Sequence, residues 1–153
     1  MANIAVVRAK REYTKCQALK NFEIVIDSLD GKTNLLAWDV VYTPCPAWVV
    51  PLPKSPSGLF SKTYTLQVLI PEDYPFHAPK INFVNPVFHP NIDRKGEMCI
   101  PQLTAWLPSY TIESILNTLH SRFIEPDLDN PINIEATEMW KNDIEGYRRK
   151  VNS

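Results

Sequence analysis

The segment Thr63–Ile70, with the sequence TYTLQVLI, has the clearest strand pattern of the chain. Its apolar side chains Tyr64, Leu66, Val68 and Ile70 alternate with polar ones and therefore share one face. Such alternation is typical of an antiparallel strand with one face on a hydrophobic core and the other in water. The segment therefore predicts a sheet with one buried face.

Three more runs of the same kind accompany this strand. Residues 22–26, 35–42 and 81–84 are rich in β-branched and aromatic side chains, and Asp30-Gly31 provides a turn between the first two runs. Short strands that follow one another along the chain favour an antiparallel meander over a parallel sheet. We therefore expect four antiparallel strands.

Helical spacing precedes and follows the strands. Apolar residues recur every three or four positions over residues 2–19, and the same spacing begins after Thr111, a predicted N-cap, and ends at Pro126. Residues 133–141 and 143–151 predict two further helices. This order predicts an α+β fold with an N-terminal helix, a four-stranded antiparallel meander and C-terminal helices.

Composition limits the class of protein. Of the 153 residues, 22% are charged and 44% are hydrophobic, so residues 1–153 are expected to form a single folded domain. A net charge of -1 gives no reason to expect a nucleic-acid partner, and no apolar run approaches the length of a membrane span. The three cysteines are too widely spaced for a zinc site or a disulfide framework. We expect a monomer in the cytoplasm, the nucleus or both, with no bound metal.

Proline is frequent and confined to one part of the chain. All 14 prolines lie between residues 44 and 131, and five of them fall between Pro44 and Pro56. Because proline donates no backbone hydrogen bond, residues 44–58 are expected to form a loop or an interrupted edge. Residues 71–108 are also expected to be irregular, and long irregular stretches inside a domain are usually functional.

Cys99 lies within this irregular stretch, eight residues after Asn91. Taken alone, the cysteine has three interpretations. It is a buried structural thiol, as free cysteines often are, or a nucleophile paired with a histidine base, or a carrier that holds an acyl group as a thioester. The motifs around the cysteine distinguish these interpretations.

Five short motifs occur in order along the chain. They are YPFxxP at 74–79, FHPNI at 88–92, GxxCI at 96–100, WxP at 106–108 and EPxxxxP at 125–131. Together they resemble the ubiquitin-conjugating enzyme family over nearly the whole chain, including the spacing from His-Pro-Asn to the cysteine. The resemblance implies the conjugating-enzyme fold, which agrees with the order of elements predicted above.

The resemblance assigns a role to each residue of the site. It implies that Cys99 accepts the carboxyl-terminal carbonyl of ubiquitin from an activating enzyme. It also implies a mixed catalytic and structural role for Asn91, which donates to the oxyanion directly or by ordering the loop around Cys99. An ordinary turn residue is the alternative for Asn91. His89 is expected to hold the turn by hydrogen bonding, and Pro90 to fix its backbone. No cofactor is implied, because ATP is used by the activating enzyme.

Two positions depart from family members that pass ubiquitin to lysine. Those members carry acids where this chain has Pro101 and Asn130, and an acid there favours loss of the lysine proton. Asp127 and Asp129 lie near enough in the sequence to compensate in part. Proline two residues after the cysteine resembles the branch that serves HECT and RING-between-RING ligases. We therefore expect discharge to ligase cysteines in preference to free lysine.

Partner surfaces also follow from the resemblance. Phe76 and Pro108 match two loops that contact a ligase, and Arg8, Arg11 and Lys15 form a basic helix face suited to an acidic groove of the activating enzyme. The alternatives are a core aromatic for Phe76 and a solvated face for the three basic residues.

Three other functions are alternatives to a ubiquitin-conjugating enzyme. A non-catalytic ubiquitin-binding scaffold and a conjugating enzyme for another ubiquitin-like modifier would have the same fold. Retention of both Cys99 and Asn91 favours an enzyme over the scaffold. A Cys-His hydrolase would need a base oriented toward Cys99, and the proline-bound His89 is poorly suited to that role.

Overall fold

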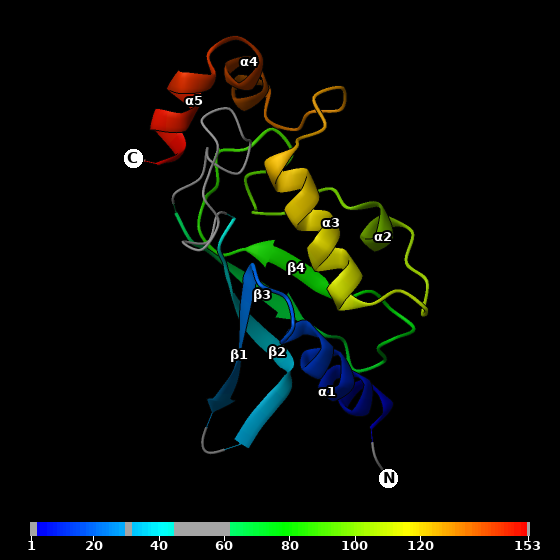
Figure 1. Ribbon diagram of the computed structural model, residues 1–153. Helices are drawn as coiled ribbons and strands as arrows, with labels where there is room; N and C mark the ends of the chain where they lie inside the picture. Colours follow the sequence, from blue (N-terminus) through cyan, green and yellow to red (C-terminus); the bar gives the residue numbers. More distant parts are fainter. Residues whose placement is uncertain (1–2, 30–31, 45–61, 153) are drawn as a thin grey trace.

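The computed structural model describes residues 3–29, 32–44 and 62–152 and consists of one sheet with helices around it (Figure 1). In chain order the elements are α1 (Ile4–Cys16), β1 (Phe22–Leu29), β2 (Lys32–Tyr42), β3 (Tyr64–Leu69), β4 (Lys80–Phe83), α2 (Pro101–Thr104), α3 (Ile112–Ile124), α4 (Ile134–Asn142) and α5 (Ile144–Val151). α1 contacts β1, β2 and α3, while α4 and α5 pack together at the end of the molecule away from the N-terminus (Figure 1). The predicted α+β fold is confirmed.

The four strands form one antiparallel sheet in the order β1-β2-β3-β4. In its centre, Val40 of β2 pairs with Ile24 of β1 and with Leu66 of β3. These three side chains are buried, as is Val68, whereas Val25 on the opposite face is 49% exposed. The alternation predicted for the third strand is therefore confirmed, and the meander has the expected single buried face.

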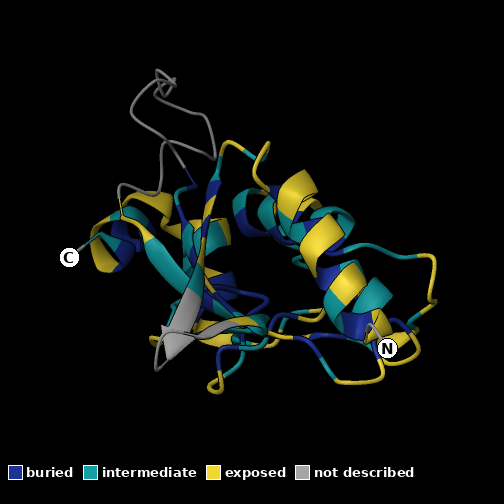
Figure 2. Cartoon of the chain, turned by 90° about the horizontal axis from the view of Figure 1, so that it is seen from below, coloured by how far each residue is buried: buried dark blue, intermediate teal, exposed yellow. Residues whose placement is uncertain are grey.

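The apolar side of α3 packs in the same core as the strands, since the ring of its Phe123 lies 5.2 Å from that of Tyr42 in β2 and 5.8 Å from that of Phe83 in β4. Figure 2 shows the helices with exposed residues on their outer sides. The buried residues of α3 are Ile112, Ile115, Leu116, Leu119 and Phe123. Burying a side chain of this size stabilises a fold by about 1.5–3 kcal/mol, so the helix is held mainly by this face. Thr111 caps the helix as predicted: its side chain accepts from the N–H of Ser114 at 3.2 Å, and the Thr111 N–H donates to the Ser114 hydroxyl in return.

α1 is shorter than predicted, and α2 was not predicted; the other helices agree with the prediction to within two residues. α1 begins after Asn3, whose side chain accepts from the N–H of Ala5, and ends at Cys16 rather than residue 19. It ends there because the N–H groups of Ala18 and Leu19 bond to carbonyls three residues back, which tightens the turn. α2 was not predicted, since a single turn that begins with proline has no repeating apolar face.

The proline-rich loop predicted at residues 44–58 lies outside the described residues except for Pro44, and Cys45 also falls in that range. In the described parts of the chain, no helix is long and apolar enough to cross a membrane. The fold as described therefore rests on the sheet, on α3 and α1 against it, and on the segment between β4 and α3, which contains the predicted site.

Candidate active site

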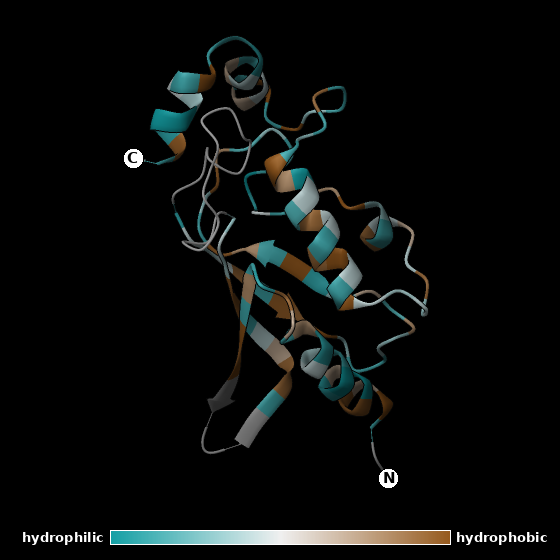
Figure 3. Ribbon diagram, viewed as in Figure 1, coloured by the Kyte–Doolittle hydropathy of each residue, from teal (hydrophilic) through white to brown (hydrophobic). Residues whose placement is uncertain are grey.

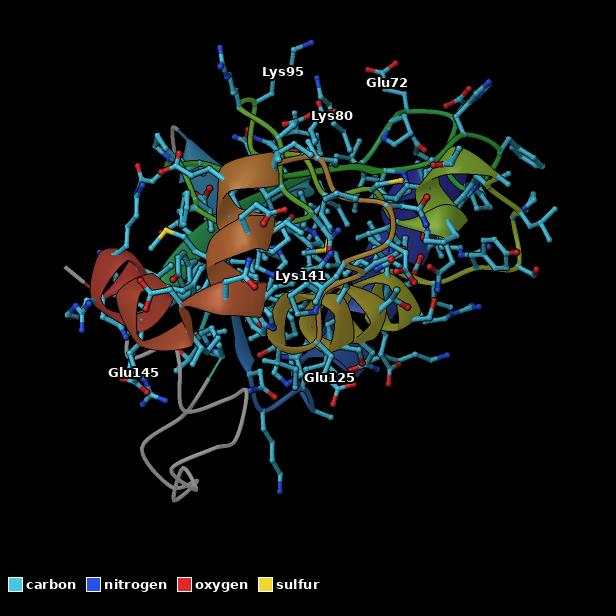
Figure 4. The ribbon with its side chains drawn as sticks, turned by 90° about the horizontal axis from the view of Figure 1, so that it is seen from above. Glu72, Lys80, Lys95, Glu125, Lys141 and Glu145 are labelled. Atoms are coloured by element: carbon cyan, nitrogen blue, oxygen red, sulfur yellow. The ribbon has the colours of Figure 1, made fainter. Side chains whose placement is uncertain are left out.

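Cys99 lies on the surface, in the segment between β4 and α2. Its exposed side chain rules out the alternative of a buried structural thiol. The cysteine borders a cleft of about 350 Å³ lined by Pro79, Lys80, Ile81, Asp93, Glu97, Met98, Cys99, Ile100, Leu103, Thr104 and Ile132. Lys80 and Lys95 point from the same edge of the molecule, opposite Glu125 (Figure 4). Because Cys99 is exposed, a reacting group on a second protein has direct access to its thiol.

The segment that carries the cysteine is fixed to the sheet through Gly96. The N–H of Phe83 in β4 donates to the Gly96 carbonyl at 2.7 Å, and Met98 forms a bridge with Ile92. Gly96 has φ of 84°, and a Cβ at this position would lie 2.2 Å from the Phe83 carbonyl oxygen. Only glycine allows this close approach, so the residue places Cys99 three positions further on.

His89 is completely buried and stacks on Phe123 with 4.8 Å between ring centroids. Its Nδ1 accepts from the backbone N–H of Asn91 at 3.0 Å, so its Nε2 carries the proton and donates to the Phe123 carbonyl at 2.8 Å. Both ring nitrogens are thus occupied away from Cys99. Burial lowers the pKa of His89 to about 4, which keeps the ring neutral near pH 7. The hydrolase alternative is therefore contradicted, since His89 cannot serve as the base.

Asn91 joins the turn to a distant loop. Its Nδ2 donates to the Asp127 carbonyl and its Oδ1 accepts from the Asp127 N–H, both at 2.8 Å, and only 2% of the residue is exposed. The Pro90 carbonyl accepts from the N–H groups of Ile132 and Asn133 at 2.8 and 3.0 Å. The turn predicted around residues 89–91 is therefore bound along both sides of the 127–133 loop. These contacts favour the ordering role of Asn91 over direct donation to an oxyanion.

Asp127 closes a small turn with its own carboxylate. The carboxylate accepts from the N–H of Asp129 at 3.0 Å and from the N–H and the Nδ2 of Asn130, both at 3.3 Å. The hydrogen bond from Asp129 is the main cause of a lowered pKa for Asp127, with the charge of Arg122 as a further cause. Asp129 and Asn130 are exposed, and Pro101 is the exposed first residue of α2. The roles of Pro101, Asp129 and Asn130 in the reaction stay predictions.

The stability of the protein should fall on acidification because of His89. Its pKa is about 4 in the folded chain and 6.5 when unfolded, so only the unfolded chain takes up the proton between these values. Stability is therefore full above about pH 6.5 and declines toward pH 4, by up to about 3 kcal/mol. Urea titrations at a series of pH values measure the decline. A His89→Gln variant should be less stable at neutral pH and have a flatter profile.

His120 provides the control for this profile, because burial lowers its pKa as well. Its Nδ1 lies 2.6 Å from the hydroxyl of Tyr42. The partly buried His120 should contribute less than the fully buried His89. A profile that flattens in His120→Gln but not in His89→Gln would contradict the assignment to His89.

The two predicted ligase-contact loops lie side by side. The Nε1 of Trp106 donates to the Pro75 carbonyl at 2.7 Å and thereby ties one loop to the other. Phe76 is 66% exposed, which rules out the alternative of a core aromatic, and Leu107 and Pro108 are also exposed. The contact with a ligase itself stays a prediction.

Arg8 does not belong to the free basic face that was predicted. Its guanidinium pairs with Glu12 at 3.2 Å, donates to the Tyr110 carbonyl at 2.8 Å and lies over the ring of Tyr74. Arg11 and Lys15 are exposed on the same helix. Two of the three predicted basic residues are therefore exposed, whereas Arg8 is partly buried and paired within the chain.

Glu12 is a structural residue that the sequence analysis missed. It is 3% exposed, and it accepts from the hydroxyl of Tyr74 and, at 2.7 Å, from the N–H of Ile112. With Arg8 it therefore joins α1 to the loop before Phe76 and to the beginning of α3. Its position among basic residues gave no indication of burial, because its partners lie 62 and 100 positions away.

Across the described residues, no group of three or more His, Cys, Asp or Glu side chains is arranged to hold a metal ion. The groups that the site itself offers are an exposed thiol, a buried amide and a neutral imidazole.

Comparison with known proteins agrees with this arrangement. The family model described as ubiquitin-conjugating enzyme matches residues 8–153. Ubiquitin-conjugating enzyme E2 N of Drosophila melanogaster is 38% identical over 87 residues, which cover 56% of this chain and 58% of that protein. Ubiquitin-conjugating enzyme E2 T is 35% identical in Mus musculus and 36% in Danio rerio, over 58% of this chain and 46% and 48% of those proteins.

The matched regions thus span about half the length of these relatives. The family model, by contrast, extends over nearly the whole of this chain and includes the His-Pro-Asn turn and Cys99. The helix, meander and later helices also occur in the order that the motifs predicted. The chain therefore belongs to the ubiquitin-conjugating enzyme family.

Proposed function

We propose that this chain carries ubiquitin as a thioester on Cys99 and passes it on with a ligase, preferring ligase cysteines over free lysine. The observation that carries the proposal is the exposed thiol of Cys99 at a cleft, in a segment held by the Gly96–Phe83 hydrogen bond. A thiol that is both exposed and fixed can meet a thioester on one protein and an acceptor on another. Membership of the conjugating-enzyme family supports the same reaction.

In the proposed transfer to Cys99, the thioester on the activating enzyme is exchanged for a thioester on Cys99. The Cys99 thiolate attacks the carbonyl carbon of ubiquitin on the activating enzyme, and a new C–S bond forms while the carbonyl oxygen becomes an oxyanion. Collapse of this intermediate breaks the old C–S bond. The cysteine of the activating enzyme leaves as a thiolate and takes up a proton from water. Discharge to a ligase cysteine repeats these steps with Cys99 as the leaving group.

The preference for thiols is supported by the contacts of Asp127, the acid of the loop that is bound to Asn91. A lysine acceptor must lose a proton as it attacks, and a carboxylate beside it assists this loss. The carboxylate of Asp127 already accepts three hydrogen bonds, and its lowered pKa makes it a weak base. Pro101 and Asn130 have no acidic group to offer. A cysteine acceptor reacts as a thiolate and needs less assistance.

The ligase partner is proposed to dock on the apolar surface formed by Ile4, Val7, Phe76, Leu107 and Pro108. The first four side chains are 47–66% exposed, and the start of α1 is hydrophobic (Figure 3). The network of Arg8 and Glu12 joins α1 to both loops. Exposed apolar groups gathered in this way are typical of a protein interface. HECT and RING-between-RING ligases are the proposed class, because they present a catalytic cysteine.

A thioester assay tests the proposed function. The chain is incubated with activating enzyme, ATP and, in separate reactions, ubiquitin and other ubiquitin-like modifiers. We expect an adduct with ubiquitin that a reductant removes, that is absent in Cys99→Ala and that becomes a reductant-resistant oxyester in Cys99→Ser. An adduct with a different modifier only would assign the chain to that modifier. The absence of every adduct would favour the scaffold.

Discharge of the charged chain tests the preference for thiols. We expect free cysteine to remove ubiquitin quickly and free lysine to do so slowly. Supplying the missing acids, in a Pro101→Asp and Asn130→Asp double variant, should raise the rate with lysine by at least about tenfold and leave the rate with cysteine nearly unchanged. Rapid discharge of the wild-type chain to lysine would refute the preference.

A further inference from the structure

Arg122 lies in the last turn of α3 and contacts the residue proposed to carry the thioester. Its Nη1 donates to the carbonyl oxygen of Cys99 at 3.1 Å. The bond connects residues 23 positions apart and joins α3 to the segment before α2. In the sequence Arg122 is simply a cation at the end of a helix, where the helix dipole favours positive charge. The contact with Cys99 is additional to that general effect.

The charge of Arg122 also reaches the turn that Asn91 holds. The charge of Arg122 acts on the Asp127 carboxylate, where it contributes to the lowered pKa. The backbone of Asp127 is bound on both sides by the amide of Asn91. The guanidinium is therefore bound to the cysteine's own carbonyl, and its charge also influences the Asp127 carboxylate. The side chain of Arg122 is partly buried.

We propose that Arg122 is a positioning residue for acyl transfer at Cys99, holding the Cys99 carbonyl and keeping a positive charge at the residue where the oxyanion develops. The assignment rests on the proposed function, because it requires a reaction at Cys99. A bond to the cysteine's own carbonyl restricts rotation of the following peptide and so restricts the direction of the thiol. The positive charge of Arg122 stabilises the anionic intermediate more than the uncharged thioester from which it forms.

The expected size of the effect follows from these two contributions. The misplacement of a reacting atom by about 1 Å can cost about 100-fold in rate. The Cys99 segment keeps its Gly96–Phe83 bond without Arg122, so the displacement should be smaller. We therefore expect a loss of about tenfold when Arg122 is replaced by an uncharged side chain of similar length.

Three variants separate positioning from general charge and from folding. Arg122→Met removes both the donor and the charge but keeps the apolar stem. Arg122→Lys keeps the charge and one donor. Arg149→Met is the matched control, because Arg149 is an exposed arginine in the last turn of another helix, α5. Urea midpoints of all three variants show whether each folds as the wild-type chain does.

The rate of charging by the activating enzyme, measured over a range of chain concentrations, separates kcat from KM. We expect Arg122→Met to lower kcat about tenfold with KM within about twofold, Arg122→Lys to recover most of the loss, and Arg149→Met to behave as wild type. Equal rates for Arg122→Met and wild type, or equal losses for Arg122→Met and Arg149→Met, would overturn the assignment. So would a loss in Arg122→Met that Arg122→Lys does not relieve.

The same experiment distinguishes this proposal from the proposed function. If the wild-type chain forms no adduct with any modifier, the proposed function fails and the role of Arg122 fails with it. If the wild-type chain forms the thioester adduct and Arg122→Met forms it equally fast, only the role of Arg122 fails. Should Arg122→Met prove unfolded, Arg122→Gln, which also removes the charge, takes its place: a loss of about tenfold supports the assignment and a wild-type rate overturns it.

Discussion

Replacing Glu12 by alanine should lower the free energy of unfolding by about 3 kcal/mol. The carboxylate is buried and accepts from the Tyr74 hydroxyl, the Ile112 N–H and the Arg8 guanidinium. Removing it leaves a buried N–H, a buried hydroxyl and a cation without their acceptor. For a chain of this length the melting temperature should fall by about 6–12 °C. Urea denaturation and calorimetry measure both quantities.

Two comparisons test the cause of this loss. Glu12→Gln keeps an acceptor for Ile112 but loses the charge that faces Arg8, so its stability should lie between those of wild type and Glu12→Ala. Glu72→Ala, which removes an exposed glutamate, should change stability by less than about 0.5 kcal/mol. If Glu12→Ala is no less stable than Glu72→Ala, the buried network contributes nothing.

Replacing Asn91 by alanine should reduce charging of Cys99 by about 100-fold, because a loosened loop misplaces the reacting groups by about 1 Å. The change removes two 2.8 Å hydrogen bonds and leaves both the N–H and the carbonyl of Asp127 without partners. The loop that carries Asp127 should then loosen, at a cost of about 2 kcal/mol in stability. Single-turnover charging and hydrogen exchange of the Asp127 N–H measure the two effects in parallel.

Asp127→Ala separates the two roles assigned to Asn91. It removes the carboxylate that closes the turn with Asp129 and Asn130 but leaves the backbone bonds to Asn91 in place. If Asn91 acts by ordering the loop, Asp127→Ala should reproduce a measurable part of the loss in rate. If Asn91 acts only by direct donation, Asp127→Ala should be charged as fast as wild type, and the ordering role would be refuted.

The parts of the fold predicted from sequence are those determined by local pattern. Thr111 is followed by a helical apolar stripe and was correctly placed as the N-cap of α3, because capping and periodicity act within a few residues. The strand around Leu66 and Val68 was correct for the same reason. α2 was missed because four residues are too few for a period.

The parts that sequence could not provide depend on distant contacts. Arg8 and Glu12 lie in a helix whose charged residues look solvent-exposed, yet their partners Tyr74, Tyr110 and Ile112 follow much later in the chain. Cys99 could be named by resemblance, but its contact with α3 could not. Pairings of this kind become visible only when the meander and α3 have brought the segments together.

The hydrogen bond from Trp106 to the Pro75 carbonyl has a consequence for the thermodynamics of association. It links the loops of Phe76 and Pro108 before any partner arrives. Glu12 ties the first of these loops to α1 through Tyr74, and Arg8 ties the second through the Tyr110 carbonyl. The conformational entropy of arranging this surface is therefore lost when the chain folds and not when it meets a ligase. A ligase that binds here should do so with a small entropic penalty and with little change in the backbone of either loop.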